Sequence, residues 1–401
     1  MRLETYLIQP LEGDKQMTKN QDILELQDLI VNFYTYEGKV EALDGVNLKM
    51  REGETLGLVG ETGCGKSVTS LATLVLVPAP GKIEGGNARF RTDKGVVDLT
   101  KQNDAMLRGI RGKDIAMIFQ DPRSALNPVY TVENQLAEVF MHHRLHEMCQ
   151  RSLDEIEKDL KKKSSKAFFY RIERNLYQKM SKNPKAFSVR IISRIPIVNR
   201  YRRRVKKEIR KEVVRTLKTL KIPDPERVAD MYPHELSGGM AQRVVIAMAL
   251  GCSPGLLIAD EPTTNLDVTI QAQILEQVRE LKDKFESSIL YITHDLGVVA
   301  EVCDRVAVMY AGNVVEIADV EEIFKHPLHP YTQALLESIP RPGKGFAPIE
   351  GEVPSLIAPP PGCRFNPRCQ KGIEVCNRQK PKLVEVDKDH FVMCHLYGES
   401  S

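Results

Sequence analysis

Closely spaced glycines in residues 60–67, with the sequence GETGCGKS, are followed by a lysine and a hydroxyl side chain. The glycines let the backbone curl so that its N–H groups face an anion. Lys66 would neutralise the β- and γ-phosphates of a nucleotide, and the Ser67 hydroxyl would ligate Mg²⁺. Chance produces this pattern in roughly one or two per cent of chains of this length. We therefore predict a nucleotide-binding loop made of Gly60, Glu61, Thr62, Gly63, Cys64, Gly65, Lys66, Ser67 and Val68.

Two adjacent carboxylates, Asp260 and Glu261, follow the apolar run at residues 256–259. A buried strand would deliver them to the carboxyl edge of a parallel sheet, where ligands bind in such folds. Taken alone, an Asp-Glu pair at the end of a strand is as often a solvent-exposed pair with no catalytic role. Beside a phosphate loop, we expect Asp260 to hold Mg²⁺ and Glu261 to polarise the attacking water as general base.

The elements that must position these groups follow an α/β pattern. Residues 23–33 and 40–50 alternate as a small antiparallel sheet would, and 55–59 indicates a buried strand before the glycine loop. Long crossovers separate four further strand candidates, which predicts a mainly parallel core; they are residues 115–119, 256–259, 288–293 and 305–310. A charged, largely helical stretch ends near Pro233, and frequent prolines after residue 325 predict an extended appendage instead of more sheet.

The bulk composition is that of an ordinary globular protein, with 401 residues and 42% apolar side chains. Its longest apolar runs, residues 71–77 and 244–250, fall far short of the ~20 residues that span a bilayer. Acidic residues interrupt the start of the chain, unlike a secretion signal. We expect a cytoplasmic protein that does not cross a membrane alone.

Residues 236–243, LSGGMAQR, resemble the signature motif of ATP-binding-cassette (ABC) ATPases. The resemblance implies that Ser237, Gly238 and Gly239 begin a helix whose N-terminus approaches the γ-phosphate bound by a partner subunit. Serine before a helix is also a plain N-cap, but here the motifs occur together and in order. Met240 stands where many members have Gln, and methionine there is usual in the peptide-importer branch.

Other elements of the family fall in sequence. By resemblance, Gln120 contacts Mg²⁺ or water, Asp267 lies across the dimer seam and His294 hydrogen-bonds the γ-phosphate. Tyr36 resembles the aromatic residue on which adenine stacks, although Tyr34 is close enough to compete. Cys64 replaces the commoner serine of the loop without removing a phosphate ligand.

Four cysteines crowd the last tenth of the chain, while the other four are scattered. In a reducing cytosol such a cluster is more often a metal site than a pair of disulfides, and Cys-only ligation suits an iron–sulfur cluster. Structural zinc, which usually uses a short C-x₂₋₄-C knuckle, and surplus thiols stay open. Residues 326–340 and 360–369 resemble the C-terminal extension of oligopeptide, dipeptide and nickel importer ATPases, in which a [4Fe-4S] cluster is held by the counterparts of Cys363, Cys369, Cys376 and Cys394.

The expected fold class is α/β: a P-loop ATPase core with an antiparallel β subdomain, a helical signature subdomain and a C-terminal iron–sulfur-binding extension. We expect a polar tail over residues 1–21, the nucleotide-binding domain over 22–325 and the extension over 326–401. The resemblance implies an ATPase that energises import of peptides or related small solutes. Its partners would be a second ABC ATPase, two transmembrane permeases and, indirectly, a solute-binding protein, at the cytoplasmic side of the membrane. A cassette ATPase of translation or DNA repair and an iron–sulfur redox enzyme are the competing classes.

The basic insertion, residues 158–211, carries 20 lysines and arginines against 3 acidic residues, a net charge of +17 in a chain of net charge +3. One hypothesis is contact with the anionic cytoplasmic leaflet, which attracts such clusters. A solvated basic hairpin, or a loop that contacts acidic protein, is the plainer interpretation. Nucleic acid is not an expected partner, because nothing else in the chain supports it.

Overall fold

A computed structural model describes residues 22–161, 167–182, 203–264, 268–339 and 348–398. The chain divides into two compact units, each described by itself. The sheet unit comprises Met1–Gln120, Gly255–Thr263 and Val278–Ser401, and the helical unit comprises Asp121–Pro254 and Thr264–Gln277. Asp267 and much of the basic insertion lie outside the described residues.

An eight-stranded sheet forms the core of the sheet unit, in the order β11-β12-β10-β9-β3-β8-β7-β6. Its five parallel strands confirm the predicted ones: β3 (Thr55–Val59), β6 (Ile115–Ile118), β7 (Leu256–Asp260), β8 (Ser288–Thr293) and β9 (Arg305–Tyr310). Every residue of β3, β7, β8 and β9 is buried, as expected for parallel strands that are covered on both faces.

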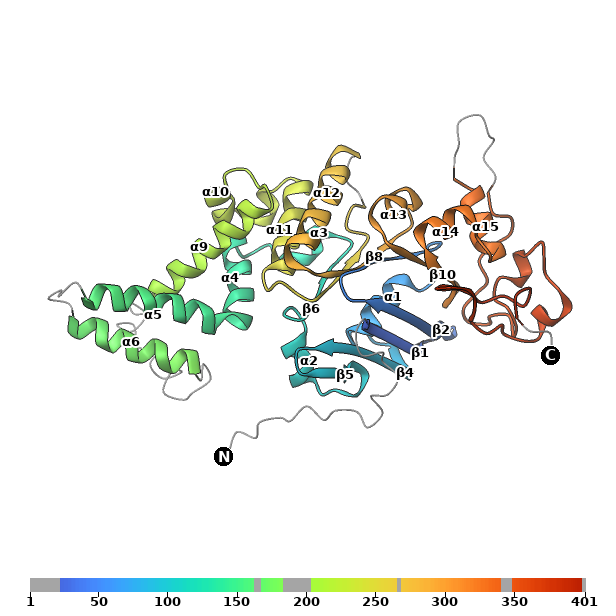
Figure 1. The fold of residues 1–401 in the computed structure, drawn as a ribbon, viewed down its shortest axis with the longest axis horizontal. Coiled ribbons are helices and arrows are strands. Elements are labelled where there is room, and N and C mark those ends of the chain that lie inside the picture. Colours follow the sequence, from blue (N-terminus) through green and yellow to red (C-terminus); the bar gives the residue numbers. More distant parts are fainter. Residues whose placement is uncertain (1–21, 162–166, 183–202, 265–267, 340–347, 399–401) are drawn as a thin grey trace. The chain divides into compact units, whose positions relative to one another are not determined.

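A second, antiparallel sheet has the order β2-β1-β4-β5 and lies within the same unit (Figure 1). The predicted pair became β1 (Asp22–Thr35) and β2 (Gly38–Arg51), while β4 (Gly81–Thr92) and β5 (Gly95–Asp98) were not anticipated. Gly86 has φ +82°, and a Cβ there would lie 2.4 Å from the carbonyl oxygen of Asp28. Only glycine fits this close approach of two strands.

The helices of the sheet unit follow its strands, as the crossovers predicted. They are α1 (Lys66–Thr73), α2 (Asp104–Ile110), α13 (Leu296–Val302), α14 (Val320–Lys325) and α15 (Pro330–Glu337), together with the second half of α12 (Val268–Phe285). None of the helices in the described part of the chain is long and apolar enough to cross a membrane.

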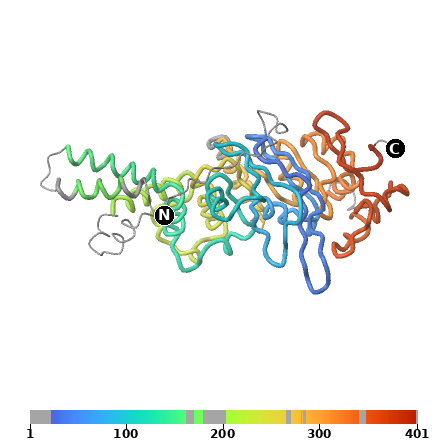
Figure 2. The backbone as a smooth tube through the Cα atoms, turned by 90° about the horizontal axis from the view of Figure 1, so that it is seen from below, coloured from blue at the N-terminus to red at the C-terminus, as the bar shows by residue number. Residues whose placement is uncertain are grey.

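The helical unit contains the charged stretch that the sequence placed before Pro233. Its helices are α3 (Pro122–Ala125), α4 (Val132–His143), α5 (Leu145–Lys161), α6 (Ala167–Lys182), α9 (Arg203–Thr219), α10 (Pro225–Asp230), α11 (Gly238–Leu250) and the first half of α12. Helices α5 and α6 lie side by side in both views (Figure 2). Helix α9 buries Val205, Ile209, Val213 and Leu217, one every four residues, which is the stripe of an amphipathic helix.

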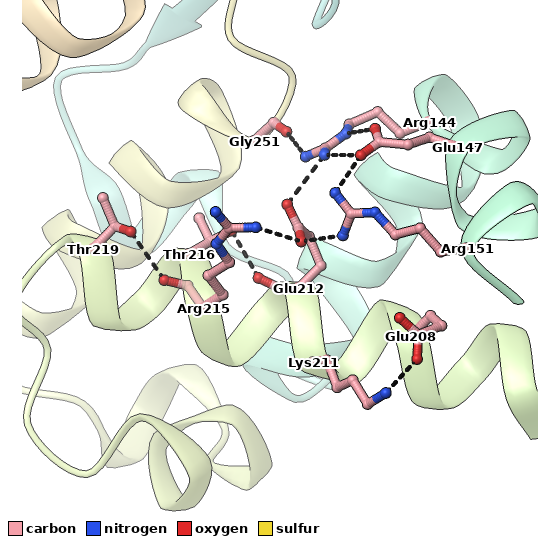
Figure 3. Close-up of polar contacts among 10 residues, drawn as sticks. All are labelled: Arg144, Glu147, Arg151, Glu208, Lys211, Glu212, Arg215, Thr216, Thr219 and Gly251. Atoms are coloured by element: carbon pink, nitrogen blue, oxygen red, sulfur yellow. Dashed lines mark hydrogen bonds and ion pairs between the residues drawn. The ribbon is translucent and has the colours of Figure 1, made fainter. Parts of the chain in front are cut away.

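A buried carboxylate on α9 joins the helices of this unit (Figure 3). Glu212 lies 3.1 Å from Nη2 of Arg144 and 2.7 Å from Nη1 of Arg151. Arg144 also donates to the carbonyl oxygen of Gly251 at 2.9 Å. Both arginines contact Glu147 as well. Part of the charge of the surrounding helices is therefore neutralised inside the unit.

The C-terminal extension was expected to be an extended appendage without further sheet, but it adds two strands to the main sheet. β12 (His390–Val392) pairs with β10 (Asn313–Asp319), and β11 (Val384–Asp387) pairs with β12, all antiparallel. No proline follows Pro381, so the last residues keep the N–H groups that a ladder needs. Buried Glu316 of β10 lies 2.8 Å from Nε2 of His390 and accepts the amides of Leu328 and His329, which ties the extension to the core.

The iron–sulfur-binding part of the predicted fold class is wrong. In the described ranges, no group of three or more histidines, cysteines and acidic residues could hold a metal ion. The backbone around two of these cysteines is closed by a hydrogen bond from the Cys363 amide to the Cys376 carbonyl oxygen at 2.8 Å. Burial raises the pKa of Cys363 to about 11 and also raises the pKa of Cys369 and Cys394.

Candidate nucleotide-binding site

The predicted phosphate loop connects β3 to α1. Gly60, Gly63 and Gly65 have φ values of +154°, +81° and +105°. A Cβ on Gly60 would lie 2.1 Å from the carbonyl oxygen of Met309 on β9. The loop therefore needs glycine both for its backbone angles and for its contact with the neighbouring strand.

Lys66 begins α1 and is 7% exposed. Its Nζ donates to the carbonyl oxygens of Gly60 at 2.7 Å and Glu61 at 3.1 Å, so the ammonium lies within the loop. The Cys64 carbonyl oxygen accepts the amide of Gly312 at 2.8 Å. Burial raises the pKa of the Cys64 thiol. Cysteine here packs as a small apolar side chain and does not alter the charge of the loop.

Asp260 ends β7 next to the loop. The hydroxyl of Ser67 donates to Oδ1 of Asp260 at 3.2 Å. Burial raises the pKa of Asp260, and the hydrogen bond from Ser67 opposes that effect. A hydroxyl and a carboxylate oxygen side by side match the hard oxygen ligands that Mg²⁺ prefers. The two residues fit a magnesium ion bound together with nucleotide phosphate.

Two predicted residues from neighbouring strand ends contact the carboxylate of Glu261. Gln120, after β6, donates through Nε2 to Oε2 of Glu261 at 2.8 Å. Nδ1 of His294, after β8, lies 3.0 Å from Oε1. Glu261 itself has φ +45°, and its amide donates to the carbonyl oxygen of Ile292 at 2.9 Å. The sheet thus fixes a carboxylate between an amide and an imidazole, beside the Asp260 and Ser67 pair.

Other predicted site residues lie elsewhere. Ser237 caps α11 in the helical unit, and its hydroxyl accepts the amide of Met240 at 3.3 Å. Gly238 and Gly239 form the first residues of that helix. Tyr36 is 98% exposed in the turn between β1 and β2, whereas Tyr34 hydrogen-bonds Glu84. Tyr36 is thus the more accessible of the two candidate adenine contacts.

Sequence reasoning missed two residues of the C-terminal extension that contact the loop, Arg368 and Tyr331, and a third, Tyr310, that contacts Arg368. Arg368 forms an ion pair with Glu61, Tyr310 contacts Arg368, and the hydroxyl of Tyr331 accepts the Glu61 amide at 3.0 Å. Arg368 lies in the motif at residues 360–369 that indicated the extension. The motif itself does not indicate that Arg368 contacts an acidic residue 307 positions away.

A glycine loop between a buried strand and a helix, with Asp and Glu at the next strand end, defines a P-loop ATPase. The family model described as "ABC transporter" matches residues 43–264. A second, described as "Oligopeptide/dipeptide transporter, C-terminal region", matches residues 315–376. The chain belongs to the ABC transporter family and is an ATPase subunit of its oligopeptide/dipeptide branch.

Individual relatives agree with this assignment. The dipeptide transport ATP-binding protein DppD of Bacillus subtilis (strain 168) is 43% identical over 383 residues, covering 94% of this chain and 96% of its own. The oligopeptide transport ATP-binding protein OppD of Salmonella typhimurium is 41% identical over 362 residues, covering 90% and 89%. The dimeric ATP-binding cassette MJ0796, solved with ADP and Pi, shares the fold with a TM-score of 0.52 at 22% identity, over 74% of this chain and 99% of that one.

Proposed function

We propose that this chain binds and hydrolyses ATP to energise the import of peptides or related small solutes. The observation that carries the proposal is the set of Gln120 and His294 around the Glu261 carboxylate, adjacent to Asp260 and Ser67. Glu261 accepts a proton from water as the water oxygen bonds to the γ-phosphorus. The bond from that phosphorus to the β,γ-bridging oxygen breaks, and ADP and phosphate leave.

The other residues of the site bind and orient the nucleotide. Lys66 neutralises negative charge on the phosphates, and the backbone N–H groups of the loop donate hydrogen bonds to them. Ser67 and Asp260 would hold Mg²⁺, with Gln120 as a further ligand or water contact, and the bound ion would supply positive charge beside the phosphates. His294 donates to the γ-phosphate, and Tyr36 stacks on adenine.

We place the chain in a pair of ATPase subunits, identical or homologous, at the cytoplasmic face of the membrane. In this arrangement Ser237, Gly238 and Gly239 face the γ-phosphate held by the partner, and Asp267 lies at the dimer seam. Two permease subunits form the path, and a solute-binding protein delivers the solute. The match of residues 315–376 to a peptide-transporter region favours this role over translation or DNA repair.

Reconstituted transport tests this function. The full-length chain is co-expressed with the ATPase and permease genes beside its own, and the purified complex is placed in proteoliposomes. We expect uptake of a labelled di- or oligopeptide that requires MgATP and the cognate binding protein. A complex that forms and hydrolyses ATP but imports none of a mixed peptide library would contradict the peptide assignment.

For the basic insertion, the hypothesis of contact with the membrane can be restricted to a few cations of α9. Arg204 is neutralised by Asp159 at 2.8 Å and Glu173 at 3.2 Å. Arg203, Lys206 and Lys207 are exposed on α9. Of the three, Lys207 also acts on Glu155, whose pKa its charge helps to lower. We propose that these three cations contribute to contact with anionic lipid, because each Lys or Arg near such a surface adds about 1 kcal/mol of attraction.

Reversing two of these charges should weaken vesicle binding. We expect the double variant Lys206→Glu/Lys207→Glu of the full-length chain to bind phosphatidylserine-containing vesicles at least 10-fold more weakly in co-sedimentation at low salt. Lys94→Glu/Lys113→Glu, which changes two exposed lysines of the sheet unit, is the matched control and should bind like the parent. Equal loss in both doubles, or binding to neutral vesicles, would overturn the proposal.

A further inference from the structure

An arginine from the C-terminal extension holds the side chain of the second residue of the phosphate loop. Nη1 of Arg368 lies 2.7 Å from Oε2 of Glu61, and Nη2 lies 3.2 Å from Oε1. The Arg368 side chain is 3% exposed and that of Glu61 is 27% exposed. This is a two-pronged ion pair, the geometry in which arginine recognises carboxylates most strongly.

The remaining donors of this guanidinium are also engaged. Nε donates to the carbonyl oxygen of Glu350 at 3.0 Å, Nη2 to that of Ile349 at 3.2 Å, and Nη1 to the Tyr310 hydroxyl at 3.3 Å. The guanidinium is therefore fixed on the extension and on β9 before it contacts Glu61. A side chain held in this way defines a position for its partner and does not merely follow it.

Glu61 is fixed at its backbone as well as at its side chain. Its amide donates to the Tyr331 hydroxyl on α15 at 3.0 Å, and its carbonyl oxygen accepts from Nζ of Lys66 at 3.1 Å. The neighbouring Gly60 and Gly63 have no side chain to restrict them. The extension thus restrains the backbone of the phosphate loop, whose glycines allow it many conformations.

We propose that Arg368 is a positioning residue for ATP binding, which holds Glu61 so that the phosphate loop keeps its nucleotide-binding shape. The inference rests on the proposed function of the loop and adds a role for the extension in it. A loop that adopts its binding shape only part of the time binds nucleotide with proportionally lower affinity. Because the restraint acts on the loop before and after ATP binds, its loss raises the KM more than it lowers kcat.

Arg368→Gln should raise the Kd of the full-length chain for MgATP about 5- to 10-fold, measured by isothermal titration calorimetry. Arg368→Lys, which keeps the charge but loses the fork, should recover part of the affinity. Glu61→Gln should weaken binding by a similar factor. The double variant Glu61→Gln/Arg368→Gln should be no weaker than the poorer single variant, because both changes remove the same restraint.

Two controls separate positioning from simple loss of structure. Arg378→Gln removes an exposed cation of the same extension that pairs with Glu374, and it should leave the Kd unchanged. Arg364→Gln removes a buried anchor to Glu41 and Asp44. It should lower the melting temperature. Its effect on the Kd for MgATP should be independent of Glu61→Gln, unlike the effect of Arg368→Gln.

A Kd for Arg368→Gln within twofold of the parent would overturn the inference. Effects of Arg368→Gln and Glu61→Gln that multiply in the double variant would also overturn it. If the unsubstituted chain itself fails to bind MgATP, the proposed function fails instead, so the two failures are distinguishable.

Discussion

Glu261→Gln should bind MgATP as tightly as the unsubstituted chain and hydrolyse it at least ~100-fold more slowly, because a positioned general base contributes about 10²- to 10⁴-fold to a rate. Glutamine keeps the size of the side chain and an oxygen for the 2.8 Å contact with Gln120. It does not accept the proton that water releases. Single-turnover ATP hydrolysis by the assembled complex, with the Kd measured in parallel, separates the two effects.

The matched control for this variant is Glu321→Gln, which changes an exposed carboxylate on α14 that pairs with Lys325. Its rate should equal that of the parent complex. A Glu261→Gln complex that hydrolyses ATP within threefold of the parent would remove Glu261 from the role of base. Loss of nucleotide binding by the variant would indicate that the carboxylate also shapes the site.

Lys66→Ala should lose at least ~100-fold in affinity for MgATP. The ammonium is the cation assigned to the β- and γ-phosphates, and charge-assisted hydrogen bonds from it are among the strongest contacts of such a site. The substitution also removes the donor to the carbonyl oxygens of Gly60 and Glu61. Equilibrium binding by calorimetry measures the loss.

Lys113→Ala is the control for this variant, because Lys113 is an exposed lysine of the same unit whose Nζ lies 3.1 Å from the adjacent Asp114. It should bind MgATP normally. Circular dichroism and a melting curve establish that Lys66→Ala is folded. Retention of affinity within threefold by a folded Lys66→Ala protein would exclude the assigned phosphate site.

The phosphate loop and the strand ends were predictable because their chemistry is local. Residues 60–67 are consecutive, so their types alone limit the backbone to a few shapes. The buried parallel strands are short, mostly apolar runs. Asp260 ends one of them and Glu261 follows it directly. Parallel strands end at the same edge, which is why Gln120 and His294 could be expected close to Glu261.

Features that depend on distant pairing could not be predicted from spacing. The pairing of β12 with β10 was missed because frequent prolines upstream favoured an extended chain. The contact between Arg368 and Glu61 joins residues 307 positions apart, and arginines and glutamates are too common in the sequence to be matched by type. Four cysteines in 32 residues carried no information on whether their side chains converge.

The position of β3 in the main sheet has a consequence for biosynthesis. This strand ends at Val59, yet its two neighbours are β8, which begins at Ser288, and β9. At about 5–20 residues per second, a ribosome needs roughly 10–45 s to add the ~230 residues between β3 and β8. During that interval the nascent chain carries a glycine loop whose supporting strands have not emerged. Chaperones that shield apolar segments of growing polypeptides are therefore expected to engage this stretch until translation has passed residue 310.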